Sequence, residues 1–354
     1  MSYPFRLAVV GVDHPHGAHW RQLLAQFPAE IEIVAVVPAF QGALTSLEER
    51  LASVPRFATV GEMLARVPLD GAMVALPNDE TPAVVAELAR AGKHLLVEKP
   101  VASTADELDL VVEAVTAAGV AFQTGYLWRY DEAANRLKRM LAEGQFGKLI
   151  SVEMLYATSD VRRRGPDHFL FDASVSGGGF FHWLGCHYLD LLRYLVPDTI
   201  IGVTARIGVF GATPLEVDDG GTVILEFESG GLATLVGGYW LPRWAGENRW
   251  SIRGSNRWVN WEPARPGTSG VLEIHGPQPQ WHAMEETYSV AADPTPGYGG
   301  RRGVDLVSDW LRSARGGGPC RNTIESTRDV LRLLDLIYTS SREGRRLACR
   351  LPPG

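Results

Sequence analysis

The sequence predicts two domains of different class: a doubly wound α/β domain with a parallel sheet, then an α+β domain with a large, mostly antiparallel open sheet. Over residues 1–125, short apolar runs alternate with segments of helical spacing. From residue 126 onward, strand-like runs follow one another with few helices between them. A chain of 354 residues also exceeds one ordinary hydrophobic core. We therefore place the domains at 1–125 and 126–354.

The first domain is predicted from the change between two periodicities. Strands are expected at 6–11, 31–37, 71–76, 94–97 and 120–124, and helices at 18–27, 47–51, 60–67, 82–91 and 105–118. The last helix is amphipathic, with Ser103 or Thr104 as its N-cap and Gly119 as its stop. Strands and helices that alternate at short spacing form right-handed crossovers, which produce a parallel sheet.

The second domain is predicted from its succession of strands. A helix at 132–143 precedes strands at 149–157, 200–209, 221–228, 232–240, 250–253 and 258–261, with one helix at 180–195. Turn sequences such as Ser229-Gly230-Gly231 and Gly254-Ser255-Asn256 separate neighbouring strands. Segments 262–270 and 291–303 are rich in Pro and Gly and are expected to be loops, and helices at 304–315 and 325–342 close the chain. This order favours an antiparallel sheet with helices on one face.

Composition and charge limit the partners. The net charge of −7 is spread without long runs, which disfavours nucleic acid as a partner. The basic cluster Arg162-Arg163-Arg164 is either a solvated loop or a site for an anionic substrate. No apolar run approaches the ~20 residues of a membrane span, and the first residues lack the pattern of a signal peptide. Three scattered cysteines indicate a reducing compartment, so we expect a cytoplasmic protein without a membrane partner.

A segment at the end of the fourth predicted strand carries a family resemblance. Residues 92–100 read Gly-Lys-His-Leu-Leu-Val-Glu-Lys-Pro, which resembles the A-G-K-H-V-hydrophobic-E-K-P signature of the glucose–fructose oxidoreductase / inositol dehydrogenase (Gfo/Idh/MocA) family. Three other segments resemble family elements in the same order: Ala75-Leu76-Pro77-Asn78, Gly125 to Arg129, and Gly177-Gly178-Gly179 followed by Gly185-x-His187-x-x-Asp190. The resemblance runs from about residue 6 to 345 and covers nearly the whole chain.

This resemblance implies a fold, a cofactor and a reaction. The first domain would be Rossmann-like and bind NAD or NADP, and the substrate would lie between the domains. The reaction would transfer hydride between the nicotinamide and a secondary alcohol or ketone of a sugar, polyol or similar metabolite. The resemblance also implies a homodimer or homotetramer that pairs through the open sheet. Two alternatives remain: an NAD-using enzyme that cleaves glycosidic bonds by transient oxidation, and a non-catalytic sensor of nucleotide or sugar.

Lys99 is the first candidate for the chemistry. Hydride transfer needs a group that handles the proton of the hydroxyl. Lys99 follows the carboxyl end of a parallel strand, where such sheets bind ligands, and a cation there stabilises a developing alkoxide. The resemblance places this lysine in catalysis and in contact with cofactor and substrate. It also implies four further cofactor contacts: Pro77, Asn78, Glu98 and Arg129.

His187 is the second candidate. Its helix follows three glycines, which permit a backbone to approach a ligand closely. The resemblance matches His187 to the histidine that usually transfers the proton. Asp190 lies three residues later on the same helical face and could steady the imidazole near the substrate. The alternative is a core histidine satisfied by hydrogen bonds.

The family's aspartate is missing from this helix. It normally precedes the histidine by four residues, and Trp183 stands there, directly after His182. Because Trp cannot exchange a proton, either Lys99 and His187 suffice, or His182 substitutes as a catalytic group, or redox activity is weakened. On an ideal α-helix His182 is rotated by about 100° from Trp183 and should point elsewhere. Trp183 would then border the substrate.

The phosphate-binding loop also departs from the family. Only Gly11 remains of the expected G-x-G-x-x-G, and Asp13 stands at the second glycine. Asp13 adds bulk and negative charge beside a diphosphate, or it caps the helix and leaves the phosphates to backbone amides and to His14 or His16. The D-H-x-H pattern with His19 could also be a metal site, but the rest of the chain favours a fold in which we expect none.

Two further choices stay open. The second strand ends at Val37 without an Asp or Glu nearby, so the sequence does not decide between NAD and NADP. Tryptophans are frequent in the second domain, where they either stack on sugars or serve core packing and a subunit interface. Five of them fall close together: Trp240, Trp244, Trp250, Trp258 and Trp261.

Overall fold

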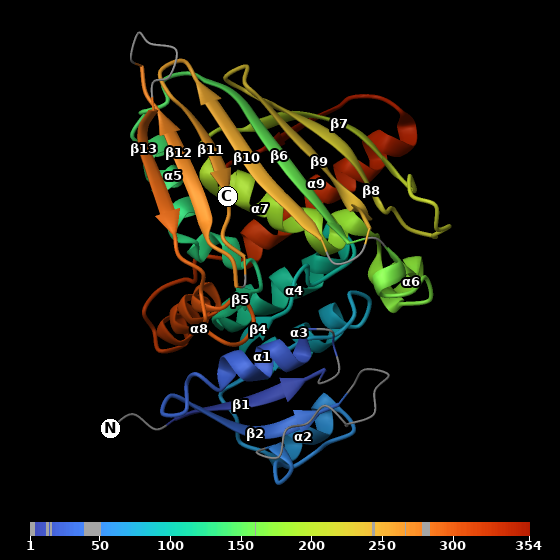
Figure 1. Cartoon of the computed structure of the whole chain (residues 1–354). Coiled ribbons are helices and arrows are strands. Elements are labelled where there is room, and N and C mark those ends of the chain that lie inside the picture. The colour runs from blue at the N-terminus through green and yellow to red at the C-terminus, as the bar shows by residue number, and fades with distance from the viewer. Residues whose placement is uncertain are drawn as a thin grey trace. The chain divides into compact units, whose positions relative to one another are not determined.

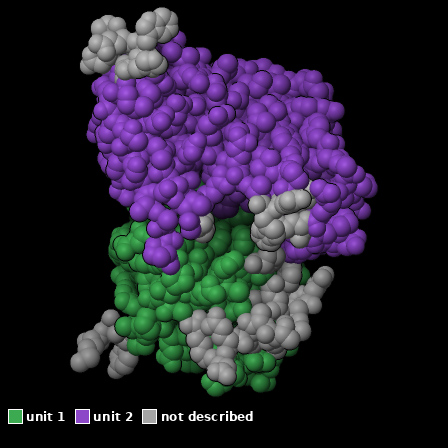
Figure 2. Space-filling model, in the orientation of Figure 1, with its two compact units in different colours: residues 1–130, 295–328 green, residues 131–294, 329–354 purple. Residues whose placement is uncertain are grey.

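The structure is a computed structural model that describes residues 4–11, 14, 16–38, 51–159, 161–242, 245–265, 267–277 and 284–354. It divides into two compact units, coloured separately in Figure 2. Unit 1 comprises residues 1–130 and 295–328, and unit 2 comprises residues 131–294 and 329–354. The chain therefore returns to unit 1 near its end. The predicted domain boundary at residue 125 does not include this return.

Unit 1 contains the predicted parallel sheet. Its five strands lie in the order β2-β1-β3-β4-β5, with parallel pairing throughout, and comprise β1 (Phe5–Val10), β2 (Ile31–Val37), β3 (Gly71–Val74), β4 (His94–Val97) and β5 (Phe122–Thr124). The connecting helices are α1 (Gly17–Leu24), α2 (Val60–Arg66), α3 (Thr81–Arg90) and α4 (Ala105–Ala118). The helix expected at 47–51 falls almost wholly outside the described residues. The strand order reverses between β1 and β3, and such a reversal is where open α/β sheets bind ligands.

The two ends of α4 confirm the predicted start and stop of this helix. Of the two candidate N-caps, Thr104 is the one used: its hydroxyl accepts from the backbone N–H of Glu107 at 3.2 Å. Gly119 ends the helix with φ 62°, a left-handed conformation that glycine adopts without steric cost.

The returning segment joins unit 1 through α8 (Arg301–Ala314). Its buried residues Leu306 and Trp310 belong to one apolar cluster with Phe5 of β1 and Trp20 of α1. The rings of Phe5 and Trp310 meet edge to face, with centroids 5.0 Å apart. Burial of this face explains why residues 295–328 pack with the N-terminal unit.

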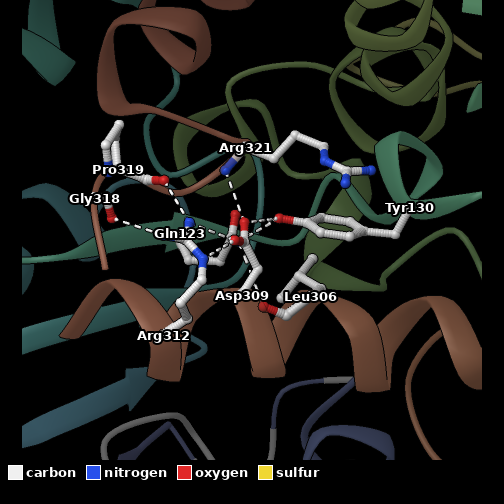
Figure 3. A network of polar contacts seen from close by, with 8 residues as sticks. All are labelled: Gln123, Tyr130, Leu306, Asp309, Arg312, Gly318, Pro319 and Arg321. Atoms are coloured by element: carbon white, nitrogen blue, oxygen red, sulfur yellow. Dashed lines mark hydrogen bonds and ion pairs between the residues drawn. The ribbon is translucent and has the colours of Figure 1, made fainter. Parts of the chain in front are cut away.

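A polar network fixes the same segment, as Figure 3 shows. The Asp309 carboxylate on α8 accepts from the Tyr130 hydroxyl at 2.6 Å and from the backbone N–H of Arg321 at 2.8 Å. Its other oxygen accepts from Nε and Nη2 of Arg312 at 3.1 and 2.7 Å. Gln123 of β5 donates to the Tyr130 oxygen at 2.7 Å. Asp309 therefore connects α8, the end of the first segment and the chain after α8.

Unit 2 contains a nine-stranded sheet in the order β13-β12-β11-β10-β6-β9-β8-β7-β14. The predicted strands are observed as β6 (Leu149–Ser159), β7 (Ile200–Gly208), β8 (Gly220–Phe227), β9 (Leu232–Leu241), β10 (Gly246–Gly254) and β11 (Trp258–Glu262). Three further strands are not predicted from the sequence: β12 (Gly270–His275), β13 (Met284–Val290) and β14 (Leu347–Leu351). Among the described strands of this sheet, only β6 and β9 pair in parallel.

Helices α5 (Glu132–Ala142), α7 (Cys186–Leu195) and α9 (Ile324–Glu343) lie on one face of this sheet (Figure 1). Serine hydroxyls of α9 accept from the backbone of β7, with Ser340 bonded to Ala205 and Ser341 to Ile207. The layered α+β prediction for the second domain is confirmed. Within the described residues, no helix has the length and apolarity that a membrane crossing needs.

The tryptophans of unit 2 have different surroundings. Trp250 and Trp261 are fully buried core residues, with ring centroids 5.8 Å apart. Trp258 stacks on His275 at 4.4 Å, and Trp244 lies outside the described residues. Trp250 and Trp261 therefore serve core packing.

Replacement of Asp309 tests the network of Figure 3. Asp309→Ala should lower the free energy of unfolding by about 1 to 3 kcal/mol, because the buried Tyr130 hydroxyl loses its acceptor. Asp305→Ala is the matched control on the same helix, since Asp305 forms an exposed pair with Arg301, and it should cost less than about 1 kcal/mol. Urea unfolding measures both variants. Equal small losses would show that the Asp309 network does not hold the segment.

Candidate functional site

Gly11 shapes the crevice in unit 1. It follows β1 with φ 84°, and a Cβ there would lie 1.9 Å from the carbonyl oxygen of Ala75. No other residue type fits this contact, because the neighbouring atom belongs to backbone. The loop after β1 is thereby held against the end of β3, at the point where the strand order reverses.

Glu98 is the polar centre of this region. Its buried carboxylate accepts from Trp20 Nε1 at 2.5 Å and lies 3.2 Å from His16 Nδ1. The ammonium of Lys99, itself fully buried, lies 4.0 Å from the same carboxylate. Burial alone would raise the pKa of Glu98, but His16, Lys99 and His14 together hold the pKa at about 2. Glu98 is therefore an anion that neutralises the cation predicted for catalysis.

His16 stands at the third glycine position of the expected loop. It directly precedes α1, and its ring packs on Tyr298 with centroids 4.9 Å apart. The His14 Nδ1 accepts from the backbone N–H of His16 at 3.1 Å. Both histidines therefore lie at a helix N-terminus, which favours bound phosphate. Asp13 lies outside the described residues.

The other predicted cofactor contacts have different environments. The Pro77 carbonyl accepts from the Thr81 hydroxyl at 2.7 Å as α3 begins, and Asn78 is half-buried beside it. Arg129 is buried and donates to the carbonyl of Arg321 at 3.1 Å, while Arg321 donates to the carbonyl of Arg129 at 2.6 Å. Arg129 thus binds the returning segment. The Gly11 turn, the helix N-terminus and the strand reversal together fit a dinucleotide.

In unit 2 the helix expected at 180–195 begins with a π turn, Phe181–Gly185, before α7. The backbone N–H of Cys186 donates to the carbonyl of Phe181, five residues earlier. His182 and Trp183 therefore lie in a π turn, and not in the ideal α-helix from which their directions are predicted. A π turn holds more residues than an α turn, so the rotation from one residue to the next differs from that of an ideal α-helix.

Asp218 holds the start of this helix. Its carboxylate accepts from the backbone N–H of Gly179 at 2.8 Å and of Phe181 at 3.1 Å. A Cβ on Gly179 would lie 1.8 Å from the Asp218 carbonyl oxygen. The glycines are predicted to permit a close approach. In the described residues, the Asp218 backbone approaches Gly179 in this way. Sequence reasoning missed Asp218, because it lies 39 residues from Gly179 and no motif marks it.

The predicted residues of unit 2 share one buried stretch. His182, Trp183, His187 and Asp190 are all less than 9% exposed. His182 Nδ1 lies 3.0 Å from the Tyr338 hydroxyl of α9, and Trp183 meets Phe169 edge to face at 6.5 Å. The structure therefore brings four of the predicted residues together in unit 2, while Lys99 belongs to unit 1.

A pocket of about 700 Å³ lies within unit 2. Arg162 and Arg206 line it beside Trp240, whose Nε1 donates to Asp219 at 3.2 Å. The indole lies across Gly238 and Gly220, where a Cβ would meet it at 2.2 and 2.6 Å. Arg162 of the basic cluster and Trp240 of the second-domain tryptophans, which the sequence analysis treats separately, therefore line one pocket.

The depressed pKa of Glu98 predicts a pH-dependent contribution to stability. Since the folded pKa of about 2 lies below the ordinary 4.5, the contribution is complete above pH 4.5 and is lost as the pH falls towards 2. Glu98→Gln should lower the free energy of unfolding by about 3 kcal/mol at pH 7, and by less at about pH 3.5. Urea titrations at both pH values measure this, with exposed Glu87→Gln as control. A difference that does not change with pH would contradict the assignment.

Comparisons with known proteins agree with this geometry. Residues 5–126 match the model of the oxidoreductase family with NAD-binding Rossmann fold, and residues 134–260 match the GFO/IDH/MocA C-terminal domain. D-xylose 1-dehydrogenase (NADP(+)) 2 of Haloferax volcanii is 24% identical over 324 residues, covering 89% of this chain and 91% of that protein. Inositol 2-dehydrogenase of Rhizobium meliloti is 26% identical, covering 67% and 70%.

Solved structures share the fold along the whole chain. Levoglucosan dehydrogenase in complex with NADH has a TM-score of 0.83 at 18% identity, covering 99% of this chain and all of that one. WlbA dehydrogenase from Bordetella pertussis, in complex with NADH and UDP-GlcNAcA, has a TM-score of 0.79 at 22% identity, covering 99% and 98%. The chain belongs to the Gfo/Idh/MocA family of NAD(P)-dependent oxidoreductases.

Proposed function

We propose that this protein transfers hydride between NAD or NADP and a secondary alcohol or ketone of a sugar, polyol or similar small metabolite. The observation that carries the proposal is the buried Lys99 ammonium beside the ionised Glu98, at the carboxyl end of β4. The xylose and inositol dehydrogenases among its relatives support the substrate class.

The cofactor would bind along the carboxyl ends of the strands in unit 1. When bound, its nicotinamide accepts or donates the hydride. Backbone amides at the start of α1 would hold the diphosphate, together with Gly11, His14 and His16. Asp13 of the same loop would border the cofactor. The remaining contacts would come from Pro77, Asn78, Glu98, Lys99 and Arg129.

The chain's own groups would handle the proton. The Lys99 ammonium would stabilise negative charge on the substrate oxygen, because a buried cation acts strongly in a low dielectric. The His187 imidazole would take the hydroxyl proton as the alcohol becomes a ketone, and Asp190 would steady that ring. Trp183 would border the substrate, since a tryptophan replaces the family's acidic residue there.

The cellular setting is also a proposal. A cytoplasmic location is supported by the three cysteines, Cys186, Cys320 and Cys349, which are free thiols. Burial raises the pKa of Cys320 to about 11, so this thiol is protonated and unreactive at neutral pH. The net charge of −7 supports a small-molecule partner in preference to nucleic acid.

Substitutions at the two proton-handling positions test the reaction. Lys99→Ala and His187→Ala should each lower kcat by about 10²- to 10⁴-fold with any sugar or polyol that is turned over. Their Kd for the nicotinamide cofactor should change far less, as measured by calorimetry. Lys93→Ala is the matched control, because this lysine precedes β4 at its amino end, donates to the Leu69 carbonyl at 3.0 Å and should keep full activity. Wild-type kcat in both Lys99→Ala and His187→Ala would contradict the assignment of these two residues to proton handling.

The open face of the unit 2 sheet supports assembly as a homodimer or homotetramer. Ile224 of β8 and Leu232 of β9 are 38% and 46% exposed, although both belong to the central strands. The register places Val236 and Leu155 on the same face. The same face also carries Thr222, Thr234 and Glu153. Exposed apolar side chains on inner strands are typically covered by a partner, and a second copy of the chain would cover this face symmetrically.

A charged residue on that face tests the assembly. Ile224→Glu should convert the assembly to monomers at micromolar concentration, because it would bury an unpaired charge. Leu110→Glu, at an apolar position 40% exposed on α4 of unit 1, is the control and should leave the mass unchanged. Light scattering gives both masses. A wild-type protein that is monomeric at this concentration would contradict the proposal.

A further inference from the structure

The pocket of about 700 Å³ in unit 2 lies mainly on the open face of the nine-stranded sheet. Arg206 of β7 and Thr222 of β8 are opposite each other in the register, and both are exposed. Gly220, two residues before Thr222, is opposite Gly238 of β9. Because side chains alternate along a strand, Trp240 shares the face of Gly238 and therefore of Thr222 and Arg206.

The helix that carries His187 packs on the opposite face of this sheet. Tyr188 of α7 stacks on Tyr156 of β6, with ring centroids 4.9 Å apart. Tyr156 is paired with Gly237 of β9, and Trp240 follows that glycine by three residues, so the two aromatic side chains are on opposite faces. The pocket side chain of Trp240 is therefore on the face away from α7.

The indole of Trp240 lies against the backbone of the sheet. A Cβ at Gly238 would lie 2.2 Å from Cε2 of this indole, and a Cβ at Gly220 would lie 2.6 Å from its Cζ2. Glycine at both positions leaves the room that the ring occupies, so one face of the indole covers backbone. Its other side lines the pocket. An exposed aromatic face of this kind stacks on the apolar C–H groups of a sugar ring.

Asp219 fixes both this ring and the loop beside it. Its carboxylate is 1% exposed and accepts from Trp240 Nε1 at 3.2 Å. It also accepts from the backbone N–H of Phe210 at 3.0 Å and of Gly211 at 2.6 Å. The Phe210 ring meets the indole edge to face, with centroids 6.2 Å apart. The indole is therefore held in place before any ligand arrives, which lowers the entropic cost of binding.

The charge of the pocket is positive. Arg206 and Arg162 line it, and Asp219, whose charge is compensated by three N–H donors, is the one acid among the described residues of the lining. Arg253, on the same face of the sheet, pairs with Glu153 at 2.5 Å, whereas the Arg206 guanidinium has no carboxylate partner among the described residues. A guanidinium binds a carboxylate or a phosphate through two parallel N–H bonds.

We propose that this pocket binds an anionic sugar, with the ring of the sugar stacked on Trp240 and its carboxylate or phosphate bound by Arg206. Asp219 is then the positioning residue that holds the indole for stacking. The hydroxyls of Thr213 and Thr222, which also line the pocket, would bond to sugar hydroxyls. This site goes beyond the hydride transfer proposed above and does not depend on it.

Calorimetric titration of the intact protein with glucuronate, glucose 6-phosphate and glucose tests the proposal without any turnover. At least one of the two anionic sugars should bind about 10-fold more tightly than glucose, because hydrogen bonds between charged groups are strong. A preference for glucuronate identifies a carboxylate as the recognised group, and a preference for glucose 6-phosphate identifies a phosphate. Equal affinity for all three sugars, or no binding at tens of millimolar, would overturn the proposal.

Substitutions on the open face test the two contacts. Arg206→Gln should remove the preference for the anionic sugar, and Trp240→Leu should weaken its binding about 10-fold. Arg253→Gln and Trp258→Leu are the matched controls on the same face, because Arg253 pairs with Glu153 and Trp258 stacks on His275, and both should keep the wild-type affinity. Equal losses in the controls, or unchanged binding in Arg206→Gln, would contradict the proposed site.

Two further variants locate the bound sugar. His187→Ala should keep the affinity for the anionic sugar, and a loss of binding in this variant would place the sugar at the residues proposed for proton transfer instead. Binding by the Ile224→Glu monomer alone, and not by the wild type, would show that a second copy of the chain fills the pocket. Either of these two results would overturn the proposal, whether or not the protein is found to be a dehydrogenase.

Discussion

The burial of the Glu98 carboxylate is the interaction on which unit 1 depends most. An isolated charge in this position is costly, so the chain surrounds it with a tryptophan N–H, a histidine ring and the ammonium of Lys99. The carboxylate in turn places a negative charge 4.0 Å from the Lys99 ammonium, whose side chain has no solvent exposure. The same carboxylate connects β4 to α1, so the cation and the start of the helix share one support.

Unit 2 also contains a buried acid, Asp218. Its carboxylate is buried at the start of a helix and accepts from that helix's backbone, as well as from Tyr338. In each unit, a buried acid thus supports a histidine close to a helix start: Glu98 bonds His16, and Asp218 reaches His182 through Tyr338. The two departures from the family pattern, the altered phosphate loop and Trp183, both occur beside these supported histidines.

Local patterns predicted much of this structure. The parallel sheet follows from the alternation of strand and helix periods. Short motifs at the ends of elements single out Lys99 and His187 as candidates, and their roles in the reaction stay predictions. The π turn could not be predicted, because residues 180–195 have ordinary helical spacing and the turn depends on contacts with Asp218. Asp218 and Tyr338 were out of reach for the same reason, as they lie 120 residues apart in the chain.

The returning segment shows a further limit of local reasoning. Helix α8 has the expected amphipathic pattern, but the pattern does not say which core it covers, and Phe5 and Trp20 decide this in the folded chain. Strands β12 and β13 were missed because their alternation is short. All residues of β13 are exposed or half-buried, so this strand has little hydrophobic periodicity.

The central claim is that unit 1 binds a nicotinamide dinucleotide although two of the three loop glycines are replaced. Calorimetric titration of the intact protein with NAD(H) and with NADP(H) measures this directly, without knowledge of the substrate. The account predicts saturable binding of one nucleotide per chain with Kd below about 1 mM, the upper end of ordinary enzyme affinities. The absence of binding of either nucleotide at several times that concentration would contradict it.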